Sequence, residues 1–457
     1  MAEVTEGKRV SWAELYFDLI FAFAVSQPTH IMVTDPHWDG FGRAFGLFAV
    51  LWWTWIGFVV LCNQHSQDRI SGRLFVLAGT LPCAVAAVET HSAGRGQVLA
   101  FACALAGARL VLALAFAFMA KGTRGVVVGY GVSAAVFAAS AFVPGPWRYV
   151  LWGFTLIQEG GFLLLRNGER ERSGGRPRGP AARRAGRAES MGAMLKPPAD
   201  PARRVDSSHL SERFGLMIMI LLGEVVASVA TSAVGLPGHD PRYWVGLLSG
   251  LVLAAALWWI YFTAAAPLGE SVLRASGGNP ALAYGLYAAG HLTPAFALLA
   301  EAAGVSLAIS GAASGAAAWL VTGGLAAFLV GSRVIYVGQQ LRFQTLRRLA
   351  TVGVTLCLAF LEPLISAAGV VLATAALAAA IAADVTYRTP GRLRTITADP
   401  LSYFRPGAPA ATPAAAEPPA AAEKPATAEE PAAESDSRRE DSHRRDRVAG
   451  ADIGGVD

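Results

Sequence analysis

The sequence carries little charge for its length. Of its 457 residues only 16% are Asp, Glu, Lys or Arg, while 54% are hydrophobic and the mean hydropathy is +0.43. Soluble proteins are charged at about a quarter of their positions. The shortage of charge excludes an ordinary soluble enzyme of two or three domains and indicates that lipid surrounds most of the chain.

Cysteine is scarce and the familiar enzyme motifs are missing. The few cysteines lie in or beside apolar runs, and no two have the spacing of a metal or redox pair. HExxH, GxSxG, P-loop and GxGxxG motifs do not occur. His209 and Glu212 form an HxxE pair, which is weak evidence for a metal without further ligands. The sequence therefore predicts neither an enzyme nor a bound metal or cofactor.

Long apolar segments are abundant. A helix needs about 20 apolar residues to cross a bilayer, and twelve segments approach that length. The last two form one apolar run that only Glu362-Pro363 interrupts, so eleven spans is the alternative. A cleavable signal peptide is not expected, because the first segment is long and contains Glu14 and Asp18. The segments are residues 12–33, 41–62, 74–91, 97–120, 125–143, 147–165, 210–232, 243–266, 281–303, 313–332, 349–365 and 366–384.

The distribution of Lys and Arg predicts the orientation of these helices, since basic loops stay preferentially in the cytoplasm. With the N-terminus inside, the loops on the outer side contain only Arg43, Arg95, Arg148 and Arg242, and all other loop Lys and Arg residues are cytoplasmic. An even number of spans then places both termini in the cytoplasm.

Two segments are too polar to enter the bilayer. Residues 166–208 form a Pro/Gly/Arg-rich linker, and residues 391–457 form a tail that is rich in Pro, Ala and Glu. We expect both to be disordered and cytoplasmic. Nucleic-acid binding is one interpretation of the basic linker, but a cytoplasmic loop near anionic lipid headgroups explains it more simply, so no nucleic-acid partner is expected.

The two halves of the chain contain similar motifs in the same order. Each half would hold six helices, residues 1–165 and 209–390, so the copies share one orientation. Parallel repeats of this kind occur in transporters, where the site lies between the halves. The matching motifs are Trp12–Phe17 with Leu210–Gly215, Leu51–Trp55 with Leu257–Tyr261, and Pro82/Glu89 with Pro294/Glu301. The fold class predicted is therefore an all-α polytopic membrane protein with about twelve transmembrane helices in two parallel six-helix repeats.

Several ionisable residues fall inside the apolar segments, where each costs about 2.5–3.5 kcal/mol on insertion scales. Glu14 and Asp18 are four residues apart and share one helix face. Glu212 has the matching entry position in the second half, and Glu224 lies about 18 Å deeper along the same helix. The candidate site residues are Glu14, Asp18, Glu159, Glu212, Glu224 and Glu362, with Arg109 and His291 in supporting roles.

The deeper candidates contain more acids than cations. Asp18, Glu159, Glu224 and Glu362 face a single obligate cation, Arg109. Four buried carboxylates cannot all be ionised beside one Arg, so either most hold protons or a cation shares the site. Both possibilities favour a proton or cation pathway.

Structural roles are the alternative for some candidates. Glu14 and Glu212 could cap helix starts, where the macrodipole favours a carboxylate. Arg109 could form a structural ion pair with one of the acids, and His291 could be a packing residue rather than part of a proton relay.

Residues 9–24, with the sequence RVSWAELYFDLIFAFA, resemble the "WxELFFDLVFVFA" opening of the bacterial low temperature requirement protein A family. Leu51–Trp55 continues the resemblance, and residues 212–224, ERFGLMIMILLGE, resemble that family's "ERFGLFxIIxLGE" block. The resemblance covers about residues 8–390. It implies a multi-pass protein of the bacterial cytoplasmic (inner) membrane, without a known substrate, and favours Glu14, Asp18, Glu212 and Glu224 as functional residues.

The function expected is a transporter or channel-like protein that moves a small solute or cation between the two halves, with proton coupling as an option. Asp18 and Glu224 would be the titrating or ion-binding groups. The alternative is a non-transporting sensor or stress-adaptation protein that acts through the linker and tail. A membrane enzyme acting on lipid is the third interpretation, although no motif supports it.

Overall fold

The computed structural model describes residues 10–64, 70–119, 123–168, 196–198, 204–234, 241–332 and 343–398. All regular structure in these ranges is helical, and the ranges fall within one compact unit, Met1–Ala410. Most of the predicted linker, and the tail from residue 399, lie outside the described residues. Helix α15 extends to Ala398, beyond residue 391 where the sequence places the start of the tail.

The first half of the chain, as we call α1 to α6, contains long single helices. They are α1 (Trp12–Thr34), α2 (Trp38–Gln64), α3 (Ile70–Gly94), α4 (Leu99–Met119), α5 (Arg124–Ser140) and α6 (Gly145–Gly168).

The second half, α8 to α15, contains interrupted helices. Two π-helical turns, η2 and η3, join α9 to α10 and α11 to α12, and such turns are often found at functional sites. The elements are α8 (Ser207–Val234), α9 (Pro241–Ile260), η2 (Tyr261–Ala265), α10 (Ala266–Ala275), α11 (Pro280–Ala283), η3 (Tyr284–Ala289), α12 (Leu292–Ser310), α13 (Ser314–Gly331), α14 (Phe343–Cys357), η5 (Leu358–Leu361) and α15 (Glu362–Ala398).

Within the described ranges, eight helical stretches are long and apolar enough to cross a membrane. They include α2, α3, α4, α8 and α13, together with the joined stretches Tyr243–Ala275, Pro280–Ser310 and Leu349–Ala398. In the last of these the α-helix is interrupted by the 3₁₀ turn η5 and by Ser366, whose φ of 66° and ψ of 165° are not helical. Pro363 lies between η5 and Ser366. Proline has no backbone N–H to donate to the preceding helical turn, which explains a break near this position.

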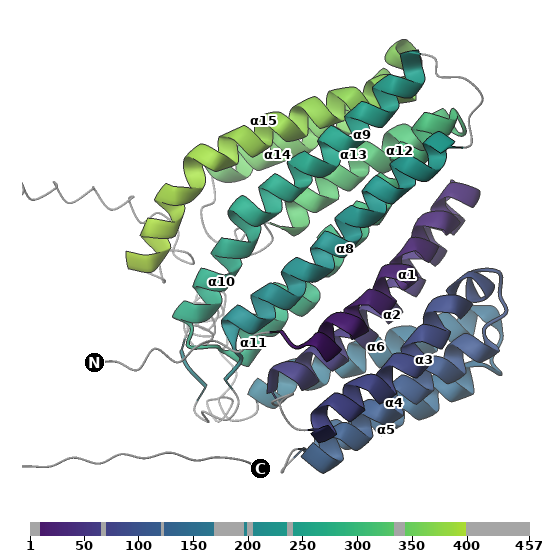
Figure 1. The fold of residues 1–457 in the computed structure, drawn as a ribbon, viewed down its shortest axis with the longest axis vertical. Coiled ribbons are helices and arrows are strands. Elements are labelled where there is room, and N and C mark those ends of the chain that lie inside the picture. The colour runs from purple at the N-terminus through teal and green to yellow at the C-terminus, as the bar shows by residue number, and fades with distance from the viewer. Residues whose placement is uncertain are drawn as a thin grey trace, which may run out of the picture. The chain divides into compact units, whose positions relative to one another are not determined.

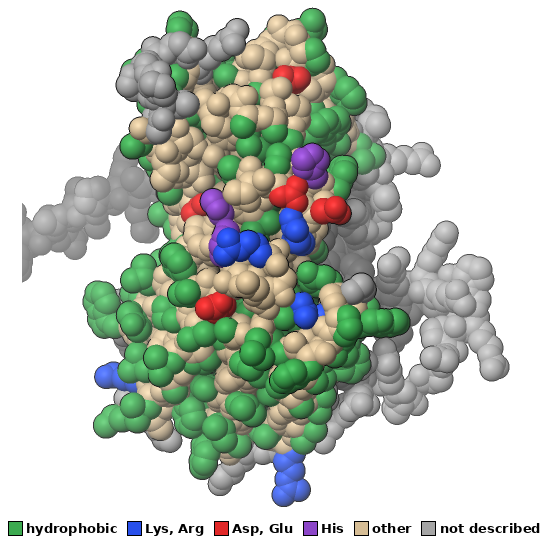
Figure 2. Space-filling model, turned by 90° about the vertical axis from the view of Figure 1, so that its right-hand side faces the viewer, with side chains coloured by type: hydrophobic (Ala, Val, Ile, Leu, Met, Phe, Trp, Pro, Cys, Tyr) green, Lys and Arg blue, Asp and Glu red, His purple; other side chains and the backbone are tan. Residues whose placement is uncertain are grey.

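The outward faces of the helices are apolar, which indicates contact with lipid. On α3 the side chains of Leu74, Leu77, Leu81, Val85 and Val88 follow one another at helical spacing and are all exposed, between 42% and 72%. Figure 2 shows the same character on one face of the molecule, where hydrophobic side chains cover broad areas and charged side chains gather near the middle. Exposed apolar surface of this extent marks a membrane protein rather than a soluble one.

Helix α1 joins the two halves. It packs against α2 and α3 of the first half and against α8 and α12 of the second (Figure 1). Phe17, Phe21, Ala24, Val25 and Pro28 are buried along its length. The contact between the halves also includes α2, where the Trp52 indole N–H donates to the Ala288 carbonyl at 2.9 Å. The carboxylates on α1 are therefore placed inside the bundle, facing the second half.

Candidate functional site

Four ionisable side chains meet where α1 packs against α8. Glu14 and Asp18 come from α1, and His209 and Arg213 come from α8. Each pair has a spacing of four residues, so each pair lies on one face of its helix. None of the four residues is more than 2% exposed. We call these four residues the α1–α8 network.

Arg213 holds the α1–α8 network together. Its Nη1 donates to Glu14 Oε2 at 2.5 Å and its Nη2 donates to Asp18 Oδ1 at 2.7 Å. The Trp55 indole N–H of α2 also donates to Asp18 Oδ1, at 2.7 Å. Charge-assisted bonds of this kind are among the strongest in proteins. Two buried atoms, Asp18 Oδ2 and Arg213 Nε, have no hydrogen-bond partner among the described residues.

Asn63 at the end of α2 determines the tautomer of His209. Its amide oxygen accepts the backbone N–H of Asp206 at 3.2 Å and its Nδ2 donates to the Asp206 carbonyl at 3.1 Å, which fixes the orientation of the amide. The same Nδ2 lies 3.2 Å from His209 Nδ1, so Nδ1 accepts. The proton is then on Nε2, which donates to Glu14 Oε2 at 2.8 Å. The hydrogen bonds thus assign a neutral His209.

The net charge of the α1–α8 network follows from this tautomer. With Glu14 and Asp18 both ionised, beside the cation Arg213 and the neutral His209, the network would be one positive charge short of neutrality. A single proton would make it neutral. The unpartnered Oδ2 of Asp18 is a buried acceptor at which that proton can bind.

Glu14 lies in the first turn of α1, next to the residue that caps the helix. Ser11 is the N-cap of α1, its hydroxyl accepts from the Glu14 backbone N–H and donates to Glu14 Oε1 at 3.1 Å. One carboxylate oxygen therefore serves the helix start and the other binds α8. Glu212, by contrast, is exposed, and Asp206 is the side chain that accepts from the first N–H groups of α8. The capping interpretation of Glu212 is therefore wrong.

A second buried network lies inside the first half. Arg109 of α4 donates from Nε to Glu159 Oε1 of α6 at 3.1 Å and also donates to the Thr54 hydroxyl of α2. Its guanidinium carbon lies 4.6 Å from the centre of the Phe137 ring. Arg109 and Glu159 are nearly or fully buried. Arg109 thus forms an ion pair with one of the acids, as the alternative interpretation of this residue expected.

Glu224 and Glu301 are buried or half-buried acids without a basic partner among the described residues. Glu224, half-buried on α8, accepts a hydrogen bond from Ser228 one turn later at 3.3 Å. Glu301 on α12 is 0% exposed, and neither of its carboxylate oxygens has a hydrogen-bond partner in the described ranges. They are therefore acids whose charge is not compensated within this part of the chain.

The remaining candidates lie apart from the α1–α8 network. Glu362 is half-buried in the first turn of α15. His291 accepts from or donates to the Tyr261 hydroxyl at 2.9 Å, and its Nδ1 lies 2.9 Å from the Leu286 carbonyl. Its ring stacks on Tyr287 at an interplanar angle of 4°. Both ring nitrogens of His291 are thus satisfied, as expected of a packing residue.

The sequence-based balance of four deep acids against one cation was wrong, because Arg213 was not counted. Arg213 lies close to the start of α8, where an arginine near the membrane surface is ordinary. The structure makes it a second buried cation. Its position four residues after His209, matching the spacing of Glu14 and Asp18, is the signal that could have identified it.

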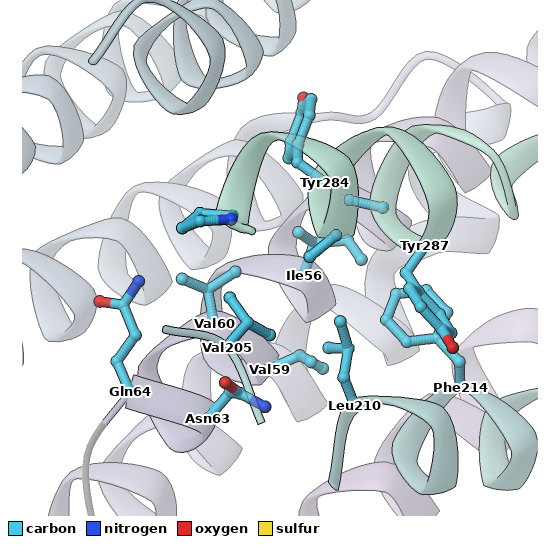
Figure 3. Close-up of a pocket in the computed structure, with 13 residues that line it drawn as sticks. Ile56, Val59, Val60, Asn63, Gln64, Val205, Leu210, Phe214, Tyr284 and Tyr287 are labelled. Atoms are coloured by element: carbon cyan, nitrogen blue, oxygen red, sulfur yellow. The ribbon is translucent and has the colours of Figure 1, made fainter. Parts of the chain in front are cut away.

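The contact between the halves is tight beside the α1–α8 network and hollow at the far end of α1. Beside the network lies a small pocket of about 50 Å³, which Asn63 of α2, Leu210 and Phe214 of α8, and Tyr284 and Tyr287 of η3 help to line (Figure 3).

A groove of about 860 Å³ lies at the other end of α1, between that helix end, the start of α2, and helices α12 and α13. We call it the α1–α13 groove. Met32 lines it, 18 residues after Glu14, which corresponds to about 27 Å along the helix. Its aromatic lining residues are Trp38, Phe41, Phe45, Phe296 and Trp319.

Metal ligands are not gathered in the part of the chain that the structure describes. There, no group of three or more His, Cys, Asp or Glu side chains is arranged to hold a metal ion.

Comparison with known proteins identifies a family but no mechanism. Residues 9–385 match the sequence profile of the bacterial low temperature requirement A protein (LtrA) family. A protein of Rhizobium meliloti (strain 1021), described as uncharacterized, is 25% identical over 269 residues, which is 57% of this chain and 60% of that protein. The chain thus spans less than two thirds of that relative. No solved structure matches it.

Proposed function

The chain belongs to the bacterial low temperature requirement A protein family of membrane proteins, and we propose that it is a proton-coupled transporter of a small solute or cation. The path would run between the first and second halves, in a protein of the bacterial inner membrane with both termini in the cytoplasm. Twelve spans in two parallel repeats remain the proposed arrangement. The observation that carries the proposal is the buried α1–α8 network, which links the halves by charge.

Burying these four ionisable groups costs free energy of desolvation. That cost suggests a role beyond holding the fold. Ion pairs taken out of water often stabilise a protein no more than apolar residues of the same volume. The α1–α8 network nevertheless joins two helices about 200 positions apart in sequence through such a pair. A contact that is bound by charge can be broken and remade when the charge changes, which an apolar contact cannot do.

The two ends of the contact between the halves differ as alternating access requires. At the Glu14 end the α1–α8 network and tight packing close the contact. At the Met32 end the α1–α13 groove opens it. Under the predicted orientation the closed end faces the cytoplasm and the groove faces outward. Transport would then involve opening the α1–α8 network while the groove closes.

Proton coupling follows from the charge of the α1–α8 network. Because the network lacks one positive charge for neutrality, Asp18 can take up a proton. The neutral Asp18 would then bind Arg213 less strongly. Glu224 lies between the network and the outer end on α8, without a basic partner among the described residues. Asp18 and Glu224 are thus the two groups proposed to exchange protons.

The test is ion flux through purified protein in liposomes that contain a pH-sensitive dye. A pH gradient is imposed first and then a K⁺ or Na⁺ gradient, for the wild type and for the Asp18→Asn/Glu224→Gln variant. Wild-type flux that the variant loses would support the proposal. A variant that remains folded and carries wild-type flux would contradict the assignment of these acids, and absence of flux in folded wild type would favour a sensor.

A further inference from the structure

Glu301 is the most isolated ionisable residue that the structure describes. Its side chain is 0% exposed in the middle of α12, and both carboxylate oxygens lack hydrogen-bond partners among the described residues. The residues around it on α12 are apolar, and α13, which packs most closely against α12, contains no ionisable residue. Neither the α1–α8 network nor the Arg109–Glu159 pair includes it.

Basic residues on the other helices around α12 are engaged or lie near helix ends. Arg242 is in the first turn of α9, and Arg392 and Arg394 are near the end of α15. The other basic groups have partners elsewhere: Arg213 with Glu14 and Asp18, Arg43 with Asp35, and Arg388 with Asp384. Of the histidines, His209 of α8 binds Glu14, and the ring of His30 of α1 lies 5.4 Å from that of His91 on α3. Glu224 of α8 and Glu362 of α15 are acids, so neither can serve as a counter-ion for Glu301.

An ionised carboxylate in this position would be unstable. A charged side chain deep in an apolar environment is costly, and without a counter-ion or hydrogen bonds nothing offsets the cost. A carboxylic acid that holds a proton is neutral and avoids most of it. Because Glu301 makes no hydrogen bond or ion pair among the described residues, it also has no evident role in holding the helices together.

Gly324 makes the space in which Glu301 lies. A Cβ atom at position 324 would be only 2.4 Å from Glu301 Cγ, so any larger residue would displace the acid. Gly324 also lines the α1–α13 groove, as do Ala297 and Ala300, which are respectively four residues and one residue before Glu301 on α12. Glu301 is thus separated from the groove by residues that have almost no side chain.

Glu224 and Glu301 lie at similar depths on neighbouring helices. Helices α8 and α12 run side by side in the same direction, since the Phe214 ring lies 5.1 Å from the His291 ring at one level and the hydroxyls of Ser232 and Ser306 are 2.7 Å apart further along. Counting back from these contacts places the two acids within about one helical turn, roughly 5 Å, along the axis. The half-buried acid and the fully buried acid are therefore at one level of the bundle.

We propose that Glu301 is a proton-binding site inside the helix bundle that exchanges its proton through the α1–α13 groove. The ligand is the proton itself, held as a neutral carboxylic acid. As the coupling group of the transporter this role rests on the proposed function, but protonation and exchange can be measured without any transport.

Infrared spectroscopy tests the protonation directly. A protonated carboxyl group absorbs at a higher frequency than a carboxylate, in a region free of the amide bands. Purified protein at neutral pH should show such a band that is lost in Glu301→Gln and kept in Glu212→Gln, where the acid is exposed. A folded wild type without a Glu301 band would overturn the proposal, because Glu301 would then be ionised.

The environment of the acid is tested by a matched pair of glycine substitutions. Gly324→Ala should shift the frequency of the Glu301 band, because the new methyl group meets Glu301. Gly323→Ala should leave the band unchanged, because a Cβ at 323 meets no atom within 4 Å although this residue also lines the groove. An equal response from both variants would contradict the placement of the acid behind Gly324.

Exchange through the groove predicts a further difference. On transfer to deuterated water the Glu301 band should shift as the proton exchanges, and Gly323→Trp, which fills the groove, should slow this shift relative to Gly323→Ala. An unchanged exchange rate would overturn the route through the groove. If the Glu301 band exchanges but the protein shows no ion flux, the proposed proton site stands and the proposed transport function is contradicted.

Glu301→Gln also separates this role from a structural one. If the acid has no partner, its neutral amide should leave the melting temperature of the purified protein the same or higher. A marked fall in melting temperature would show that the carboxyl group itself stabilises the bundle and would contradict the proposal.

Discussion

Arg213 and Glu14 are 199 residues apart in sequence and form an ion pair of 2.5 Å in which both side chains are fully buried. The pair connects the first helix of the first half to the first helix of the second. His209 also binds Glu14, and Asp18 also binds Arg213. Removal of Glu14, Asp18 or Arg213 therefore changes the net charge of the network, whereas removal of the neutral His209 does not.

The first prediction concerns stability. Arg213→Met should destabilise the protein by about 3–5 kcal/mol, because it leaves two buried carboxylates without their cation. Arg274→Met is the matched control: Arg274 pairs with Glu270 at the surface, where loss of the pair should cost less than about 1 kcal/mol. Unfolding of both variants in detergent is the measurement.

Removing the two acids as well should restore part of the stability that Arg213→Met loses. Glu14→Gln/Asp18→Asn/Arg213→Met removes both uncompensated charges and should unfold at a higher temperature than Arg213→Met alone. If the triple variant were the less stable of the two, the stability of the α1–α8 network would not be governed by charge balance.

A second prediction separates the Arg109–Glu159 pair from the α1–α8 network. Glu159→Gln alone should destabilise the protein, since Arg109 then keeps an uncompensated charge among buried residues. Arg109→Met/Glu159→Leu should recover stability and retain ion flux per folded molecule, because the pair lies within one half and does not join the two. Loss of flux in this stable double variant would assign the pair a part in the path.

The third prediction concerns the α1–α13 groove. In a protein with exposed Cys103 and Cys357 replaced by Ala, Gly323→Cys should react with a membrane-impermeant maleimide added outside intact cells. Leu81→Cys, 72% exposed on the apolar face of α3, should not react, because a thiol in lipid does not ionise.

Two results would contradict this prediction. Labelling of Gly323→Cys only after the cells are opened would reverse the predicted orientation. Equal labelling of Leu81→Cys would show that the exposed face of α3 contacts water instead of lipid.

Much of the fold could be predicted from the sequence because apolar helices are local. Each of the twelve apolar segments falls on helical structure, and the family resemblance over residues 8–390 agrees with the matched residues 9–385. The interruption near Glu362-Pro363 was also visible, since proline marks it. The extension of α15 to Ala398 was not, because residues after 390 are polar and contain no apolar run.

The site was less predictable because its contacts join distant parts of the chain. Asp18 and Glu14 were identified as costly residues, but nothing local shows that Arg213 binds both of them. Glu301 was noticed only as the counterpart of Glu89, which is half-buried. Glu301 differs from Glu89 in being fully buried, and the space it occupies is left free by Gly324, 23 residues away in sequence.

The most direct test of the central claim compares two identical changes on one helix. Glu224→Gln and Glu212→Gln both neutralise a glutamate of α8, but Glu224 is half-buried without a basic partner in the described ranges, and Glu212 is exposed. In liposomes under an imposed pH gradient, the account predicts that Glu212→Gln carries wild-type proton flux and that Glu224→Gln loses it. Equal flux in both folded variants would contradict proton-coupled transport through this path.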